Sequence, residues 1–108
     1  LAGMDGITLL EPMENTDGNS AYFPIFIGNN YPLNRDRLYE RLRVAGVYAR
    51  RYFYPLISDM PMYRGLASAA SKNLPYAREA SERVLCLPIY PDLSEEEQNF
   101  IIDLLLNI

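Results

Sequence analysis

Three short apolar and aromatic runs alternate along the sequence with three segments that carry helix signals. The runs lie at 21–27, 47–54 and 84–89, and their β-branched and aromatic residues are typical of strands. A capping residue or a proline opens each helical segment. This order predicts an α+β fold, in which helices cover one face of a small, mostly antiparallel or mixed sheet. Pro24 indicates that the first strand lies at an edge or begins irregularly.

Helix boundaries are well marked. Ser94 and Glu97 form an S-x-x-E capping box, and the apolar residues after it share one helical face: Ile101, Leu104, Leu105 and Ile108. A second helix is expected from Arg35 to about Ala45, capped by Asn34 and closed by Gly46. A third is expected after Pro75, because proline suits the first turn of a helix.

The predicted strand at 47–54 has two distinct faces. One face carries Val47, Ala49, Arg51 and Phe53, and the other carries Tyr48, Arg50, Tyr52 and Tyr54. Tyrosines beside a guanidinium form a surface on which a planar ring could stack or a sugar could lie. The alternative interpretation is that this face packs against another domain.

Composition excludes several kinds of chemistry. The 108 residues include one cysteine, Cys86, and no histidine, so the chain forms no internal disulfide, Cys/His zinc site or histidine-based triad. The net charge of −4 disfavours a nucleic-acid binder. No apolar run approaches the length that crosses a bilayer. We therefore expect a cytoplasmic protein without nucleic-acid or membrane partners and without a metal.

Basic residues are concentrated in one part of the chain. Six of the ten lie close together: Arg35, Arg37, Arg41, Arg43, Arg50 and Arg51. They could face an anion such as a phosphate, because the planar guanidinium binds phosphate through two hydrogen bonds. The alternative is a solvated helix face with its own ion pairs. We prefer that alternative for the helical arginines and leave both open for Arg50 and Arg51.

The remaining reactive side chains have ordinary explanations. Lys72, the one lysine, stands among small polar residues that would not lower its pKa, and we interpret it as a surface residue. Cys86 between leucines is interpreted as a small core residue. Taken alone, the residues support a binding surface and show no active site.

The chain is divided by composition at residue 20. Residues 1–20 are rich in glycine, asparagine and aspartate around one short apolar piece, 7–10, and predict a loop-rich lead-in. Residues 21–108 form the expected domain. The start at Leu1, without an initiator methionine, indicates a segment cut from something longer.

An ordered set of phrases resembles one protein family. The phrases are AYFPI at 21–25, RDRL at 35–38, GVYARRYFYPL at 46–56, PMYR at 61–64, LP at 74–75 and LCLPIYPDLSEE at 85–96. In this order they resemble the C-terminal part of the DegT/DnrJ/StrS family of fold-type-I, pyridoxal-phosphate-dependent aminotransferases. The resemblance covers nearly the whole chain and is weakest before Ala21.

The resemblance implies a small C-terminal domain of a larger, homodimeric enzyme. Its large domain would hold pyridoxal phosphate, the Schiff-base lysine and the aspartate partner of the cofactor, so this chain of 108 residues alone would be inactive and hold no cofactor. The parent would use glutamate to convert a dTDP-linked keto-deoxy sugar to an amino sugar. Residues 1–20 would then lead in from the missing large domain.

The resemblance also suggests which residues face the substrate. Many relatives carry His-Phe or His-Tyr where this chain has Tyr52-Phe53, and a histidine where it has Ile57. These departures leave a more aromatic, less titratable wall, although a phenol can still donate a hydrogen bond. The expected substrate-binding set contains no catalytic residue and comprises Tyr52, Phe53, Arg50, Arg51 and Tyr54.

Two alternatives to the aminotransferase fragment remain. The chain could be an independent, non-catalytic α+β binding module. It could also be the small domain of a related pyridoxal-phosphate-dependent sugar dehydratase, because the lysine that separates the two reactions would lie outside these residues.

Overall fold

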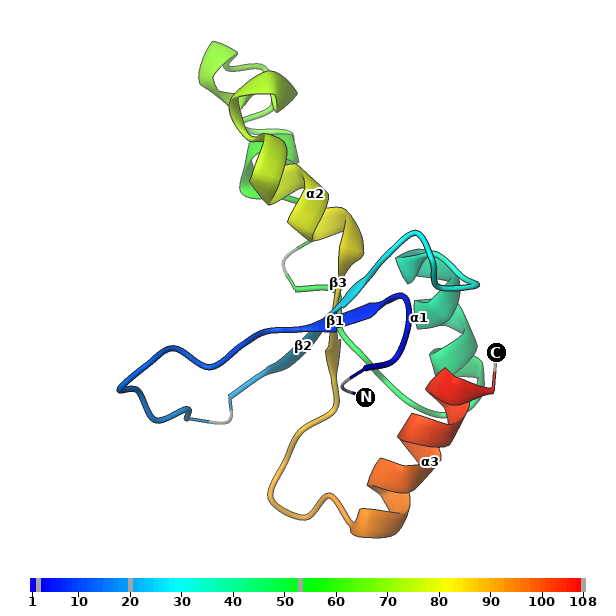
Figure 1. The fold of residues 1–108 in the computed structure, drawn as a ribbon. Coiled ribbons are helices and arrows are strands. Elements are labelled where there is room, and N and C mark those ends of the chain that lie inside the picture. Colours follow the sequence, from blue (N-terminus) through cyan, green and yellow to red (C-terminus); the bar gives the residue numbers. More distant parts are fainter. Residues whose placement is uncertain (2, 20, 53, 108) are drawn as a thin grey trace.

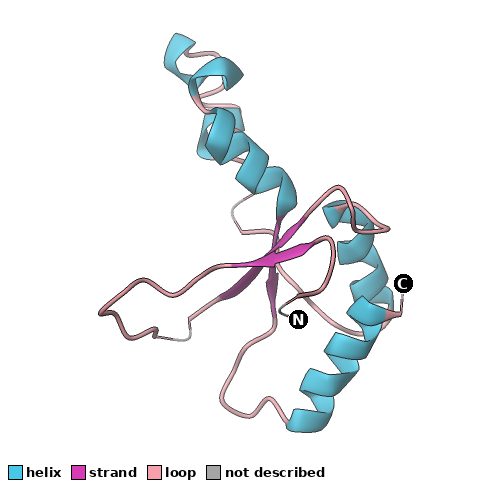
Figure 2. Cartoon of the chain, viewed as in Figure 1, coloured by secondary structure: helices cyan, strands magenta, loops and turns pink. Residues whose placement is uncertain are grey.

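The computed structural model describes residues 1, 3–19, 21–52 and 54–107. Strands β1 (Ile7–Leu9), β2 (Phe23–Ile27) and β3 (Val84–Leu87) form an antiparallel sheet in the order β1-β2-β3. The α-helices of the described part are α1 (Arg35–Val44), α2 (Pro75–Arg83) and α3 (Glu95–Leu106). The predicted α+β class with an antiparallel sheet is therefore confirmed (Figures 1 and 2).

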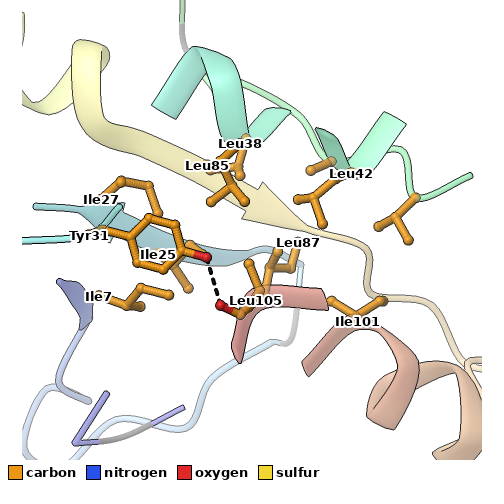
Figure 3. Packing of buried hydrophobic residues seen from close by; sticks show 12 residues of the cluster. Ile7, Ile25, Ile27, Tyr31, Leu38, Leu42, Leu85, Leu87, Ile101 and Leu105 are labelled. Atoms are coloured by element: carbon orange, nitrogen blue, oxygen red, sulfur yellow. Dashed lines mark hydrogen bonds between the residues drawn. The ribbon is translucent and has the colours of Figure 1, made fainter. Parts of the chain in front are cut away.

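The main core lies between the sheet and two helices. Helices α1 and α3 lie on the same side of the sheet (Figure 1). Apolar residues on one face of the strands meet the apolar stripes of these helices (Figure 3), and the most deeply buried are Ile25, Leu38, Leu42, Leu85 and Leu105. The buried Tyr31 hydroxyl donates a hydrogen bond of 2.7 Å to the carbonyl of Leu105, which ties the end of α3 to this core.

Local sequence signals account for the helix ends. The Asn34 side chain accepts a hydrogen bond of 2.9 Å from the amide of Arg37, and Ser94 and Glu97 form both bonds of the predicted capping box. Pro75 occupies the first turn of α2. The predicted starts of all three helices are thus confirmed. Of the residues predicted to face the core from α3, Ile108 lies outside the described residues.

The strand predicted at 47–54 is wrong. Within the described residues of this segment, its pairing with the sheet is a single bridge between Arg50 and Cys86. Val47 and Ala49 are buried as the alternation predicts, at 6% exposure each. The next inward position is Arg51, whose charge cannot enter an apolar core without partners. The segment instead leaves the sheet, and Arg51 reaches α1.

A strand also lies where a loop-rich lead-in was predicted. β1 pairs with β2 through Ile7–Ile27, Thr8–Phe26 and Leu9–Ile25. Gly6 makes this approach possible, because its φ of +81° is in the left-handed region and the backbone of Tyr31 packs directly against it. Residues 7–9 therefore belong to the sheet, whereas the assignment of 1–20 to a preceding domain stays a prediction.

The chain between 55 and 83 projects away from the sheet (Figure 1). It comprises three short 3₁₀-helices, η1 (Ile57–Asp59), η2 (Ala67–Ala69) and η3 (Ser71–Asn73), followed by α2. Arg78 on α2 holds η1 through two hydrogen bonds to Asp59, of 3.0 and 2.8 Å. Within the part of the chain that the structure describes, no helix is long and apolar enough to cross a membrane.

Candidate functional site

The structure divides the predicted substrate-binding residues into two groups. Arg50 and Tyr52 line the same hollow of the surface, whereas Arg51 and Tyr54 contact α1. Phe53 lies outside the described residues. The single face predicted to join Tyr48, Arg50, Tyr52 and Tyr54 is therefore wrong for Tyr54, because the regular alternation ends with the sheet pairing at Arg50.

The first group is an aromatic cluster around Tyr52. The rings of Tyr22 and Tyr52 meet edge to face, with centroids 5.2 Å apart and planes at 78°. The guanidinium of Arg50 lies 5.7 Å from the Tyr52 ring centroid, and its Nη1 donates a hydrogen bond to the Tyr52 hydroxyl. This contact orients the phenol and places a positive charge beside two rings.

A hollow of about 560 Å³ between β3, the 46–52 segment and α3 is lined by Tyr22, Arg50 and Tyr52. Its wall is mainly apolar and aromatic and also includes Tyr48, Pro88, Ile89, Tyr90 and Phe100. The charged groups of the wall are Arg50 and Glu97, and the Tyr90 hydroxyl donates to Glu97. A concave, aromatic wall with a cation beside its rings has the chemistry that binds a planar ring and a group next to it that the guanidinium can hold. We call it the aromatic hollow.

Cys86 lies in the wall of the aromatic hollow. Burial raises the pKa of its thiol, and a hydrogen bond with the backbone of Tyr52 offsets part of that rise. A thiol with a raised pKa stays protonated at neutral pH and is a poor nucleophile. Cys86 is thus buried as predicted, at 7% exposure, and it contributes shape to the wall.

The second group is a stack of alternating tyrosines and arginines. The guanidinium of Arg51 lies 4.6 Å from the ring centroid of Tyr39 and 5.2 Å from that of Tyr54. The guanidinium of Arg35 lies over the Tyr54 ring, 4.7 Å from the ring centroid. We call Tyr39, Arg51, Tyr54 and Arg35 the tyrosine–arginine stack. It joins the 51–54 segment to the first turns of α1.

Asp36 is shared by the two arginines of the stack. Its Oδ1 accepts hydrogen bonds from Arg35 Nε at 2.8 Å and from Arg51 Nη1 at 3.1 Å. Burial raises the pKa of Asp36, but the hydrogen bond from Arg51 and the charge of Arg35 outweigh that effect, so the net pKa is lowered. Asp36 is therefore ionised at neutral pH and holds both guanidinium groups.

The interpretation of the helical arginines as a solvated face is wrong for Arg35. It is only 3% exposed, and its Nη1 donates to the carbonyls of Ser81 at 2.6 Å and Val84 at 3.1 Å. A buried guanidinium needs such partners, and Arg35 finds them in two other elements. Arg37, Arg41 and Arg43 are exposed, as the interpretation predicted.

Sequence reasoning missed Tyr22, Tyr39 and Asp36 as members of these clusters. Tyr22 precedes β2 and meets Tyr52 across about thirty positions of sequence. No local pattern marks such a contact, because it depends on how β2 and β3 pair. For Asp36, the one available signal was its place among the arginines of α1.

The described residues do not form a site for pyridoxal phosphate by themselves. Such a site needs a lysine in an enclosed pocket. Lys72 on η3 is exposed, as predicted, and does not line the aromatic hollow. It also does not line a second, polar hollow, which lies beside Arg35, Asp36 and Tyr54. Among the residues that the structure describes, no group of three or more metal-binding side chains is found either.

Comparison with known proteins decides the family. The sequence model of the DegT/DnrJ/EryC1/StrS aminotransferase family matches residues 1–106. The chain belongs to this family. A protein from Escherichia coli, named dTDP-4-amino-4,6-dideoxy-D-glucose transaminase, is 52% identical over 96 residues, which are 89% of this chain and 26% of the relative.

Two further relatives carry similar names. A Shigella dysenteriae protein of the same name is 36% identical over the whole chain and 29% of its own length. The dTDP-4-dehydro-2,3,6-trideoxy-D-glucose 4-aminotransferase of Saccharopolyspora spinosa is 29% identical over 95% of this chain and 25% of its own length. The chain thus spans about a quarter of the length of these relatives.

Proposed function

We propose that this chain is the C-terminal small domain of an enzyme that transfers an amino group from glutamate to a dTDP-linked keto-deoxy sugar. The observation that carries the proposal is the 52% identity to the E. coli relative, whose name specifies a dTDP-linked amino sugar and a transaminase. The domain would help to close the substrate site and would not act alone. The enzyme would be a cytoplasmic homodimer.

The cofactor in this proposal is pyridoxal phosphate, held outside these residues. When bound, it would carry the amino group between the donor and the acceptor. The residues of this chain would bind and orient the acceptor. Tyr52 and Tyr22 offer ring surfaces to a base or sugar, and Arg50 offers a cation to a phosphate of the nucleotide.

The exposed surface supports a role as one part of a larger enzyme. The chain exposes 8111 Å², whereas a compact protein of this size exposes about 6100 Å². Large apolar side chains around the aromatic hollow contribute to the excess, including Tyr22, Tyr48, Tyr90 and Phe100. A surface of this kind is typical of an interface, and we propose that the large domain covers it.

The names of the relatives favour amino transfer over dehydration. All three are named as transaminases or aminotransferases of dTDP-linked sugars. The two reactions differ in whether nitrogen enters the sugar.

The cofactor proposal is tested on the protein produced from the native gene. We expect a chain several times longer than 108 residues that absorbs visible light because pyridoxal phosphate stays bound after the unbound cofactor is removed. Intact mass and an absorbance spectrum measure both properties. A native product of this length that stays colourless would support the independent binding module instead.

A further inference from the structure

Arg35 is the fixed end of the tyrosine–arginine stack. Its Nη1 bonds to the carbonyls of Ser81, near the end of α2, and Val84, at the start of β3. Its Nε bonds to Asp36, and the residue is 3% exposed. The guanidinium is thus held by the backbone of two elements and cannot reorient without breaking two buried hydrogen bonds.

The shape of the guanidinium explains why an arginine is suited to this position. Its hydrogen bonds lie in the plane of the group, so a face of the plane stays available for an aromatic ring. The Tyr54 ring lies over the group, 4.7 Å from it. A lysine would keep the charge but would offer neither the fork of donors nor the flat face.

The segment that carries Tyr52 pairs with the sheet at a single bridge within the described residues. Arg50 and Cys86 exchange backbone hydrogen bonds of 2.9 and 2.7 Å, and the pairing does not continue past them in the described part of the chain. Beyond Arg50, the stack holds the segment to α1 through Arg51, which contacts Tyr39, and through Tyr54, which contacts Arg35. Tyr52 therefore lies between the Arg50–Cys86 bridge and the stack, and it also contacts the Cys86 thiol and the Tyr22 ring.

We infer that Arg35 is a positioning residue for substrate binding, acting through Tyr54 and the Asp36–Arg51 pair on the segment that presents Arg50 and Tyr52 to the aromatic hollow. This inference rests on the proposed function, because it takes the aromatic hollow as the place of the nucleotide sugar. Arg35 itself does not line that hollow, so its effect on binding is indirect.

The first test replaces Arg35 in the full-length holoenzyme. Arg35→Lys is expected to raise the dissociation constant for dTDP, measured by calorimetry, about tenfold, because the ring contact and the fork are lost. The KM for the dTDP-linked keto sugar should rise in parallel, whereas the KM for glutamate stays unchanged. Arg37→Lys, an exposed position on the same helix, is the matched control and leaves all three constants unchanged.

A second variant keeps the test decisive if Arg35→Lys fails to fold. Asp36 is exposed, so Asp36→Asn removes the shared charge without opening the core. We expect it to weaken dTDP binding about threefold to fivefold, because a charge-assisted bond becomes a neutral one. Glu40→Gln on the same helix is its control, and thermal unfolding shows that each variant is folded.

The outcomes separate the inference from the proposed function. If the unmodified full-length protein does not bind dTDP, both are overturned. If it binds dTDP and the folded variants bind as tightly as their controls, the inference alone is overturned. An equal rise in the KM for the sugar and for glutamate would show a general loss of structure, which also contradicts a positioning role.

Discussion

Replacing Tyr52 by leucine in the full-length protein is expected to raise the KM for the dTDP-linked keto sugar about thirtyfold. The substitution removes the ring that meets Tyr22 edge to face and the hydroxyl that accepts from Arg50. Loss of one stacking ring weakens binding of a nucleotide by a factor of about ten to one hundred. Steady-state kinetics with the sugar varied at saturating glutamate measures the effect.

Two further variants define what the Tyr52 result means. Tyr76→Leu removes an equally large ring from α2, where Tyr76 is 86% exposed and lies outside the aromatic hollow, and should leave the KM unchanged. Tyr52→Phe keeps the ring and loses the hydroxyl, so it should give an intermediate rise. If Tyr52→Leu and Tyr52→Phe both behave like Tyr76→Leu, the assignment of the substrate site to this segment is wrong.

Gly6→Ala is expected to lower the free energy of unfolding by more than about 3 kcal/mol, because it combines backbone strain with a severe clash. A Cβ at Gly6 would lie 2.6 Å from the Cα of Tyr31. The backbone of Tyr31 cannot retreat easily, since its side chain is buried and bonded to Leu105. Urea unfolding followed by circular dichroism measures the loss.

Two other glycines separate the causes of that loss. Gly46 has a φ of +86° but open space around its Cβ position, so Gly46→Ala should cost about 1 kcal/mol from strain alone. Gly65 has open space and no such φ, and Gly65→Ala should be nearly neutral. Equal unfolding free energies for the Gly6 and Gly46 variants would contradict the close packing at Gly6.

Elements with local signals were predictable from the sequence. The starts of α1 and α3 follow from Asn34 and the Ser94–Glu97 box, and that of α2 from Pro75, because caps act within one turn. β2 and β3 follow from their β-branched and apolar residues. β1 was missed, because a strand of three residues carries little pattern and depends on its pairing with β2.

In the candidate site too, local arrangements were predictable from the sequence and tertiary contacts were not. Arg50 and Tyr52 were predicted to share a face, and they do, since positions two apart align in an extended chain. Tyr54 was placed with them and instead joins α1, because alternation in sequence cannot distinguish a strand from an extended segment held by side chains. The contacts of Tyr22, Arg35 and Asp36 depend on tertiary packing.

Transfer of nitrogen tests the central claim most directly. The full-length protein would be incubated with pyridoxal phosphate, ¹⁵N-labelled glutamate and a dTDP-linked 4-keto-deoxy sugar, and the sugar nucleotide analysed by mass spectrometry. The account predicts a dTDP-linked amino sugar that carries the ¹⁵N label, with 2-oxoglutarate as the second product. A sugar nucleotide that loses water without gaining nitrogen, or that is recovered unchanged, would contradict it.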